Sequence, residues 1–393
     1  MGLVLPRAVL SGVSWRKVRE MLLDKYHVEY VITSYEADNQ WNFSENTDLS
    51  EVLLVARKRC GEKAGFTFFV NLWKKPSNEL ESIHMGSQLK HLYASAKLYD
   101  IENSNASPYH LKLHGKKVGE VYSAMLEDDN FGVYNIFSQM ELNRVILFLR
   151  KGIVYLPDQG IIDGIRLTSL SKLGAEIGPD VRQVHAAFNV GESERGSVYR
   201  AFWGYDSSIV NAISQKPNAY LEPKNAGQAR DLWKRRGKLL IAERARLNTY
   251  TVLAVYLDED VLSNVWWPIR LDEEIAKILA IWMNSTFGFL LLSSIAEVTQ
   301  GPWVKFKKEH LWELPVLDIH KLGRKKRDAL LDLYDKDFDG KKINKLKFKP
   351  LPKEFAEPST RKIIDEEICN ILGLELKLDT LYKMLSKESM LTG

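Results

Sequence analysis

Short apolar runs separated by polar segments predict the first elements of the chain. Gly2–Leu5 and Val28–Ile32 are apolar on both faces, which is typical of strands in a buried sheet. Between them, residues 15–23 place apolar side chains on one face of a helix, and Ser14 is suited to cap its N-terminus. A buried strand needs neighbours on both edges, so we expect something outside these residues to cover the first strand.

The next segments predict a loop, a hairpin and a longer helix. Glu36–Asn46 is polar and rich in turn formers, which predicts a surface loop. Ser50–Ala56 and Gly65–Leu72 are two apolar runs on either side of a GEKAG turn, and they predict a hairpin. Asn78–Leu98 then has the apolar spacing of an amphipathic helix.

From about Ser104 the pattern changes to short mixed segments with frequent glycines, which favours an irregular α+β domain over repeating βα units. Within this region Leu271–Leu292 predicts a strongly apolar helix with a break near Asn284. Asn284 itself is more typical of a helix cap or a hydrogen-bonding hub than of a DNA contact. Thr360–Leu372 and Leu376–Leu385 predict a helical tail.

Composition narrows the class of protein. The 393 residues are enough for two or three domains, and two cysteines, Cys60 and Cys369, give neither a disulfide framework nor a zinc-type spacing. His110 and His114 form an HxxxH pair without a third ligand nearby in the sequence, so we expect no metal site. The chain contains no apolar stretch long enough to cross a membrane and no secretory leader, which favours the cytoplasm.

The net charge of +4 is too small to indicate nucleic acid by itself, but the basic residues are unevenly placed. They form runs that include Lys234–Lys238, Arg324–Arg327 and Lys341–Lys349. One such run is usually a solvated face. Aromatic residues interleave with lysines after residue 302, a mixture that can stack on bases and pair with phosphates.

Motifs for self-sufficient catalysis are missing from the sequence. It contains no GxG, and therefore no Rossmann fingerprint or glycine-rich methyl-donor turn, and no P-loop or GxSxG elbow. Glu375, Lys377 and Asp365 have the order of a nuclease triple, but they lie on a segment predicted to be helical, so chance is the better explanation.

The opening segments LVLPRAVLSG, HVEYVITSY and WNFSENTDLSEVLLVARK resemble the adenine-specific DNA methyltransferases of restriction-modification systems. After their catalytic Asn-Pro-Pro-Tyr motif, members of that family continue with a strand ending in Leu-Pro, a helix, a strand, an aromatic-bearing loop and a strand ending in Lys or Arg. Further stretches, ILAIWMNSTFGFLLLSS and GPWVKFKKEHLWELPVLD, resemble the family's target recognition domain and restriction specificity subunits. The resemblance reaches from residue 1 to about 320.

The resemblance implies a fold and a division into domains. The expected fold is a partial α/β methyltransferase sheet at the N-terminus, an α+β target recognition domain and a helical tail. Residues 1–103 would be the C-terminal part of the catalytic domain, 104–320 the target recognition domain and 321–393 a basic and helical tail.

The family's donor-binding and Asn-Pro-Pro-Tyr motifs should lie upstream of Leu3, and no two prolines are adjacent in this sequence. We therefore expect S-adenosylmethionine to be bound by a separate N-terminal methyltransferase polypeptide or a missing N-terminal part, and the chain alone to be inactive. The expected partners are that polypeptide and double-stranded DNA.

The resemblance also assigns site residues. Phe43, or failing that Trp41, matches the aromatic that stacks on the flipped adenine, because enzymes that methylate a base in a duplex must extrude it. The alternative is that both residues pack beneath the loop.

Two sets of residues are candidates for DNA contact. Arg244, Arg246 and Asn248 are suited to reading guanine and adenine edges, or are an exposed, solvated helix end. Trp303, Lys305 and Lys307 alternate as in a strand and would share one face, where the lysines contact phosphates or simply aid solubility.

The sequence thus predicts the DNA-recognising, adenine-positioning part of a DNA adenine N6-methyltransferase. A non-enzymatic DNA specificity subunit and an inactive remnant of a split enzyme are the alternatives. The opening strands favour the methyltransferase, since a pure specificity protein has no use for them.

Overall fold

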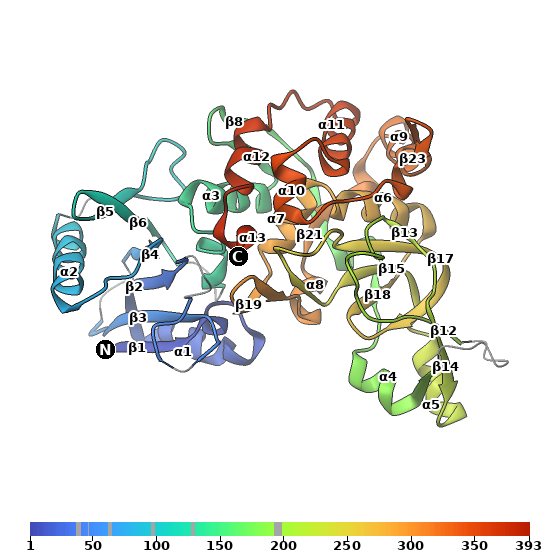
Figure 1. Cartoon of the computed structure of the whole chain (residues 1–393), viewed down its shortest axis with the longest axis horizontal. Helices are drawn as coiled ribbons and strands as arrows, with labels where there is room; N and C mark the ends of the chain where they lie inside the picture. The colour runs from blue at the N-terminus through green and yellow to red at the C-terminus, as the bar shows by residue number, and fades with distance from the viewer. Residues whose placement is uncertain (37–40, 46, 62–64, 96–98, 127–129, 192–198) are drawn as a thin grey trace. The chain divides into compact units, whose positions relative to one another are not determined.

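The computed structural model describes residues 1–36, 41–45, 47–61, 65–95, 99–126, 130–191 and 199–393 (Figure 1). The chain forms two compact units. Unit 1 comprises Met1–Asp163, Ser294–Lys305 and Leu378–Gly393, and unit 2 comprises Gly164–Ser293 and Phe306–Lys377. The domain boundary expected at residue 103 lies inside unit 1, because two strands that follow it complete the same sheet. The boundary expected at 320 lies inside unit 2.

Unit 1 is built around a sheet of six strands in the order β1-β3-β2-β4-β6-β5. β3 is antiparallel to both of its neighbours, so β1 and β2 run in the same direction, and β4 is parallel to β2. The helices and strands of this unit are β1 (Gly2–Pro6), α1 (Arg16–Lys25), β2 (Tyr26–Ser34), β3 (Glu51–Lys58), β4 (Thr67–Leu72), α2 (Glu79–Ala94), β5 (Tyr109–Leu113), β6 (Lys116–Ala124), α3 (Met140–Arg150), β7 (Ile153–Leu156), β8 (Gly160–Gly164), β19 (Glu297–Gln300), β20 (Trp303–Lys305), α12 (Asp379–Leu385) and α13 (Ser389–Thr392).

The hairpin predicted between the third and fourth strands is wrong. β3 and β4 are not neighbours, because β2 lies between them and pairs Tyr30 with Phe68 in the parallel direction. The apolar pattern of β4 reflects burial on both faces, which a central strand and a hairpin strand share, so the pattern did not distinguish them. Of the loop predicted at 36–46, residues 37–40 and 46 lie outside the described residues.

β1 is an edge strand of this sheet. Within the described chain it pairs with β3 alone, and Leu3 and Val4 are 39% and 45% exposed. The burial expected from their apolar character is therefore not supplied by the residues described here. An edge strand with free backbone groups and exposed apolar side chains is a template for pairing with another strand.

The two faces of the sheet have different covers. α2 packs Met85 and Leu92 against one face, and Asn78 begins this helix by accepting a hydrogen bond from the backbone N–H of Glu81 at 3.0 Å. On the opposite face Phe69 stacks on Tyr122 at 5.8 Å between ring centroids. The start of α3 lies on that same face, where the Asn71 side chain donates to the carbonyls of Phe137 and Ser138.

Unit 2 is built around a second sheet in the order β10-β18-β15-β17-β12-β14-β11, and β13 also pairs with β17. Its elements are β9 (Leu167–Ser169), β10 (Glu176–Ile177), α4 (Val181–Ala187), β11 (Phe188–Gly191), β12 (Tyr199–Phe202), β13 (Ser214–Gln215), β14 (Ala219–Pro223), α5 (Ala226–Trp233), β15 (Gly237–Ala242), β16 (Arg244–Arg246), β17 (Ala254–Ser263), β18 (Trp266–Arg270), α6 (Glu273–Met283), α7 (Thr286–Ser293), α8 (Lys308–Trp312), β21 (Pro315–Leu317), α9 (Arg324–Asp335), β22 (Asp337–Phe338), β23 (Lys341–Lys342), α10 (Leu351–Ala356) and α11 (Thr360–Leu372).

The predicted break in the long apolar helix is confirmed at Asn284, which separates α6 from α7. Its fully buried side chain donates to the carbonyls of Ala254 and Ala280 at 2.7 and 2.9 Å, and accepts from the Leu253 N–H at 2.9 Å. Asn284 is thus a structural hub, as its type and position indicated. Through the described residues no single helix is long and apolar enough to span a membrane, and α6 with α7 meets that criterion only as a pair bent by 84°.

Candidate nucleic-acid interface

Arg7 and Tyr35 lie at the carboxyl ends of two strands that run in the same direction. Arg7 follows β1 and Tyr35 follows β2, so both reach the same edge of the first sheet. In open α/β sheets the crevice outside the carboxyl ends of the strands is the usual place for a ligand. This edge is therefore the first part of the candidate site.

The Arg7 side chain is buried and bonded to neutral groups. Its Nη2 donates to the Tyr35 hydroxyl at 2.6 Å and to the carbonyl of Asn135 at 2.7 Å, and its guanidinium lies 4.6 Å from the centre of the Tyr35 ring. The Tyr35 hydroxyl donates in turn to the same Asn135 carbonyl. Burial raises the pKa of Tyr35 and so keeps its hydroxyl protonated. Arg7 Nη1 is buried and has no hydrogen-bonding partner among the described residues.

Trp41 completes this cluster from the loop before β3. It is 2% exposed, its ring meets Tyr35 edge-on at 5.5 Å, and the Arg7 guanidinium lies 5.8 Å from its centre. A side chain enclosed in this way cannot stack on a flipped base without leaving the core. The base-stacking role considered for Trp41 is therefore replaced by an anchoring role.

Phe43 lies two residues further along the same loop and is only partly buried. The Glu51 carboxylate accepts from the backbone N–H of Phe43 and of Ser44, both at 2.7 Å. Lys75 Nζ donates to the carbonyl of Asn42 at 2.8 Å. The loop that carries Phe43 is thus held from both sides, and its aromatic ring rests at the border of the α2-facing core.

The hairpin of β19 and β20 lies beside the start of β3. The Ser50 N–H donates to the carbonyl of Thr299 at 3.0 Å, and the Gly301 N–H donates to the Ser50 hydroxyl at 2.9 Å. This hairpin carries Trp303, which is partly exposed, and Lys305, which is exposed. Unit 1 therefore brings the Trp303 and Lys305 candidates next to the strand that leaves the Phe43 loop.

Lys307 does not continue the alternation of Trp303 and Lys305. The strand ends at Lys305, and Phe306 is buried in unit 2. The N–H of Phe306 donates to the backbone carbonyl of Glu243 at 2.8 Å, and its carbonyl accepts from Trp267 Nε1 at 2.7 Å. Lys307 instead precedes α8. The regular strand expected over 303–307 is wrong because these hydrogen bonds redirect the chain at Phe306.

Lys307 lines a hollow of about 310 Å³ in unit 2. The basic residues Arg182 and Lys308 share it with the acidic residues Asp180, Glu243 and Glu309. Lys308 Nζ donates hydrogen bonds to the carbonyls of Ile177 and Gly178. The mixed charge makes this hollow a weak phosphate site by itself.

Arg244 and Arg246 lie on the strand β16, and Asn248 lies in the turn that follows it in unit 2, so the helix end considered for these residues is wrong. The turn is closed by the N–H groups of Thr249 and Tyr250, which donate to the carbonyl of Arg246 at 3.0 and 2.9 Å. Ala245 and Leu247 are buried, and they fix the backbone from below. Arg244 is exposed, whereas Arg246 and Asn248 are partly buried.

Two polar atoms on this segment are buried without a partner among the described residues. They are Nε of Arg246 and Oδ1 of Asn248. Most buried polar groups in native proteins are hydrogen-bonded, so two such atoms two residues apart call for an explanation. They are an unpaired donor and an unpaired acceptor, and both lie beneath the surface of the segment.

The basic run at 234–238 is neutralised within unit 2. Lys234, Arg236 and Lys238 form ion pairs with Asp231, Asp260 and Glu273 at 2.8, 3.0 and 3.1 Å. Of the interleaved aromatics considered for stacking, Phe306 and Phe348 are 1% and 4% exposed and belong to the core. Lys234, Arg236 and Lys238 are therefore weaker candidates for phosphate contact than an unpaired basic residue.

The described residues contain no group of three or more His, Cys, Asp or Glu side chains placed to hold a metal ion. His114 bonds instead to Glu81 at 2.9 Å. At the carboxyl ends of β1 and β2, Arg7, Tyr35 and Trp41 are buried and pack on one another, so their side chains are not open to a nucleoside. These residues do not fit a methyl donor, so no step through the donor is assigned to them.

Several important residues were not identified from the sequence. Glu51, which fixes the Phe43 loop, begins a strand and looked like an ordinary exposed carboxylate. Arg7 carried a usable signal, because a charged residue directly after an apolar Leu-Pro strand lies at the carboxyl edge of the sheet.

No family model and no curated protein matches the chain. Among solved structures it is similar to the type IIG restriction endonuclease BpuSI, with a TM-score of 0.29 and 10% sequence identity, over 94% of this chain and 47% of that one. The chain thus spans about half the length of that enzyme, and a TM-score of this size does not establish a shared fold.

Proposed function

We propose that this chain recognises a DNA sequence and positions the target adenine as the C-terminal part of a DNA adenine N6-methyltransferase of a restriction-modification system. The substrate is double-stranded DNA. The chain supplies recognition and base positioning, and a donor-binding polypeptide supplies S-adenosylmethionine and the groups that activate the adenine amine. The chain alone is inactive.

The observation that carries this proposal is the unpartnered pair on the Arg244–Asn248 segment. Arg and Asn are the side chains whose geometry suits bidentate contact with guanine and with adenine in the major groove. Here Arg246 Nε and Asn248 Oδ1 are buried without hydrogen bonds within the described chain, on a segment that also carries the exposed Arg244. A base edge would satisfy both atoms.

Lys305 is the residue proposed to contact the DNA backbone. Lys305 is exposed on its short strand and forms no ion pair with the described residues, in contrast to Lys234, Arg236 and Lys238. A lysine of this kind neutralises a phosphate and releases counterions, which makes DNA affinity dependent on salt. Trp303 on the same hairpin offers a partly exposed aromatic surface.

Phe43 is the residue proposed to stack on the extruded adenine. Its loop is tethered by Glu51 and by Lys75, and the neighbouring Trp41 is anchored in the core. Such a tethered loop can present one aromatic ring with little loss of conformational entropy. Stacking of a base on an aromatic side chain contributes about 1–3 kcal/mol.

The donor-binding polypeptide is proposed to pair with the open edge of β1. This edge exposes Leu3 and Val4 together with unpaired backbone groups. A strand added there would satisfy the backbone and bury both side chains. It would also lie next to the carboxyl edge that carries Arg7.

Two measurements test this function. Selection of bound duplexes from a random pool should yield a defined sequence motif, and Arg246→Ala and Asn248→Ala should each relax one position of it. The matched control is Arg16→Ala, an exposed arginine on α1 that pairs with Glu20 at the surface. A pool without enrichment would refute sequence recognition.

The second measurement separates the enzyme part from a pure specificity subunit. Donor-binding candidates encoded beside this chain are mixed with it, and methylation of the selected duplex is followed. Methylation that requires both proteins supports the proposed role. Sequence-specific binding that never leads to methylation favours the non-enzymatic specificity subunit.

A further inference from the structure

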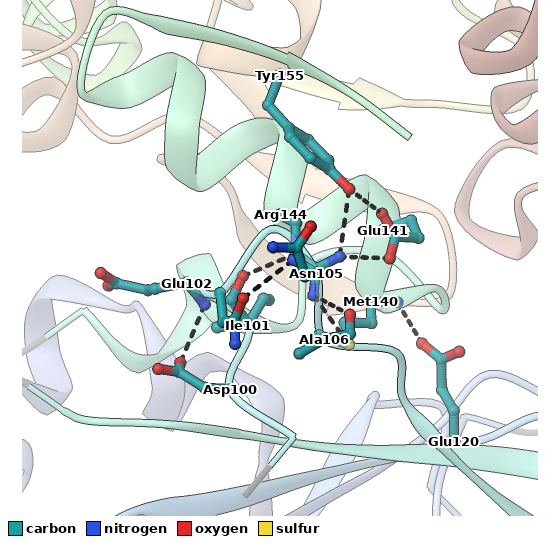
Figure 2. A network of polar contacts seen from close by, with 11 residues as sticks. Asp100, Ile101, Glu102, Asn105, Ala106, Glu120, Met140, Glu141, Arg144 and Tyr155 are labelled. Carbon is teal, nitrogen blue, oxygen red and sulfur yellow. Dashed lines mark hydrogen bonds and ion pairs between the residues drawn. The ribbon is translucent and has the colours of Figure 1, made fainter. Parts of the chain in front are cut away.

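Two buried carboxylates lie on either side of one short segment at the start of α3. Glu388, near the end of the chain, accepts from the N–H and the hydroxyl of Ser138 at 2.8 and 2.9 Å. Glu120, from β6, accepts from the N–H of Met140, as Figure 2 shows. Glu388 and Glu120 are 0% and 4% exposed. The amides of residues two apart lie within about 7 Å, so one short stretch of backbone holds both carboxyl groups, and the charge of Glu388 acts on Glu120.

Among the described residues, no hydrogen bond or ion pair joins either carboxylate to a cation. The nearest cation on this side, Arg144, donates to the carbonyls of Ile101 and Ala106 at 2.9 and 2.6 Å and to Glu141 at 2.5 Å (Figure 2). Glu141 accepts a further hydrogen bond from Tyr155 at 2.8 Å. Among the described residues, Tyr35 and Tyr122 also interact with the pair, and burial raises the pKa of both phenols and keeps them neutral. Arg7 bonds to Tyr35, not to a carboxylate.

Two like charges in a low-dielectric interior cannot both be ionised without a large cost, so such a pair holds a proton near neutral pH. Burial raises the pKa of Glu120 to about 8, and the neighbouring Glu388 adds to that shift. Burial also raises the pKa of Glu388. The pH at which the pair loses its proton is therefore close to the physiological range.

The element that this pair secures is the C-terminal segment Leu378–Gly393, which belongs to unit 1. The segment buries Leu381, Leu385 and Leu391 almost completely, and Thr380 donates to Asp158 at 2.7 Å. Glu388 joins this segment to Ser138, just before α3, through two hydrogen bonds.

The same stretch of chain leads directly to the candidate site. Asn135, three residues before Ser138, offers its carbonyl to both Arg7 and Tyr35. Its side chain donates to Thr33 on β2 at 2.8 Å. A change in how Ser138 is held is thus transmitted to the cluster that anchors Trp41.

We infer that Glu120 and Glu388, two electrostatically coupled carboxyl groups that hold one proton between them at neutral pH, form a pH-sensitive latch, which holds the C-terminal segment on unit 1 and opens when that proton is lost. With the proton present, each carboxyl group accepts a backbone N–H and the segment is closed. On deprotonation the two charges repel across Ser138–Met140, and the C-terminal segment, which is the movable partner, is released. This inference does not depend on the proposed function.

The test is hydrogen exchange of the full chain, expressed as protection factors so that the intrinsic effect of pH is removed. In the wild-type protein the amides of residues 381–391 should lose about tenfold or more in protection between about pH 6 and about pH 9, which corresponds to about one pKa unit of coupling. Glu388→Gln, which keeps an acceptor for Ser138 but cannot ionise, should keep the segment protected throughout. Glu120→Gln should do the same, because it leaves Glu388 without its neighbour.

Glu375→Gln is the matched control, since this exposed carboxylate lies outside the pair and should leave the wild-type pH profile unchanged. The latch is refuted if wild-type protection does not change with pH, or if both glutamine variants lose protection as the wild type does. Should Glu388→Gln fail to fold, the wild-type profile and Glu120→Gln still decide between these outcomes.

Discussion

The Arg7 guanidinium donates to the Tyr35 hydroxyl at 2.6 Å, and each of these residues directly follows a strand of the same sheet. This contact joins the ends of β1 and β2 across the intervening β3. It also places a buried cation beneath Trp41, the anchor of the loop that carries Phe43. The architecture of the candidate site in unit 1 depends on this pair.

Removal of the Arg7 side chain should destabilise unit 1 strongly. Arg7→Ala leaves the carbonyl of Asn135 without its charged donor and leaves space beside Tyr35 and Trp41. We expect a loss of about 3 kcal/mol in the free energy of unfolding, measured in urea. Tyr35→Phe removes one hydroxyl and should cost about 1–2 kcal/mol. Arg16→Ala, at an exposed ion pair, should change stability by less than about 0.5 kcal/mol, and an equal loss in all three variants would contradict the account.

The stability of the protein should fall as pH rises towards 8. The folded-state pKa of Glu120, about 8, exceeds its ordinary value of 4.5, because burial disfavours the charged form. The contribution of Glu120 to the free energy of unfolding is therefore fully present below about pH 4.5, and it is lost as pH rises through about 8. Between these limits the unfolded chain is ionised and the folded chain is protonated, so the loss is up to about 1.4 kcal/mol per pH unit.

Urea unfolding of the wild type, Glu120→Gln and Glu375→Gln at about pH 6 and about pH 8 checks this expectation. Glu120→Gln should have the flatter dependence on pH, and Glu375→Gln should follow the wild type. Parallel slopes for all three proteins would show that Glu120 does not titrate as its burial requires.

Asn284 should be essential for the stability of unit 2 but should have no effect on which DNA sequence is selected. Its side chain pairs the N–H of Leu253 and the carbonyls of Ala254 and Ala280, and Ala at this position leaves three buried backbone groups unsatisfied. We expect Asn284→Ala to cost about 2–4 kcal/mol. Thermal unfolding measures the loss, and the DNA motif selected below the transition should be that of the wild type. A relaxed motif would instead indicate a direct DNA contact.

Substitution of Phe43 should affect methylation, whereas substitution of Trp41 should affect stability. Phe43→Ala should lower methylation by the assembled enzyme about tenfold or more, since stacking on the flipped base is worth about 1–3 kcal/mol, while the melting temperature changes little. Trp41→Ala should lower the melting temperature, because a side chain that is 2% exposed leaves a large cavity. Normal methylation by Phe43→Ala would refute base stacking by this residue.

The spacing of apolar residues and the residue types were sufficient to predict local elements such as helices and the break between two of them. The helix predicted at Thr360–Leu372 has those bounds, and the break at Asn284 is present, because an amide within a continuous apolar run has few other roles. They were insufficient where distant segments decide the structure. β4 pairs with β2 rather than β3, and Phe306 leaves the strand of Trp303 because Glu243 and Trp267 hold its backbone.

The candidate site was accessible from the sequence only in part. Arg246 and Asn248 were identified by type, and their unpartnered atoms became evident only from burial. The sequence could not show that Phe43 is partly buried and Trp41 fully buried, since both are aromatics in one polar loop. Glu388 reaches Ser138 across 250 residues of sequence, and no local pattern indicates such a contact.

Binding of the selected duplex as a function of salt and sequence tests the central claim most directly. The account predicts that the logarithm of the affinity falls linearly with the logarithm of salt concentration, and that Lys305→Ala lowers the slope by about one for each phosphate lost. It also predicts that Arg246→Ala reduces the preference for the selected duplex over a scrambled one by about tenfold or more, with nonspecific binding unchanged. Affinity that is independent of salt, or a preference for the selected duplex that survives Arg246→Ala together with Asn248→Ala, would contradict it.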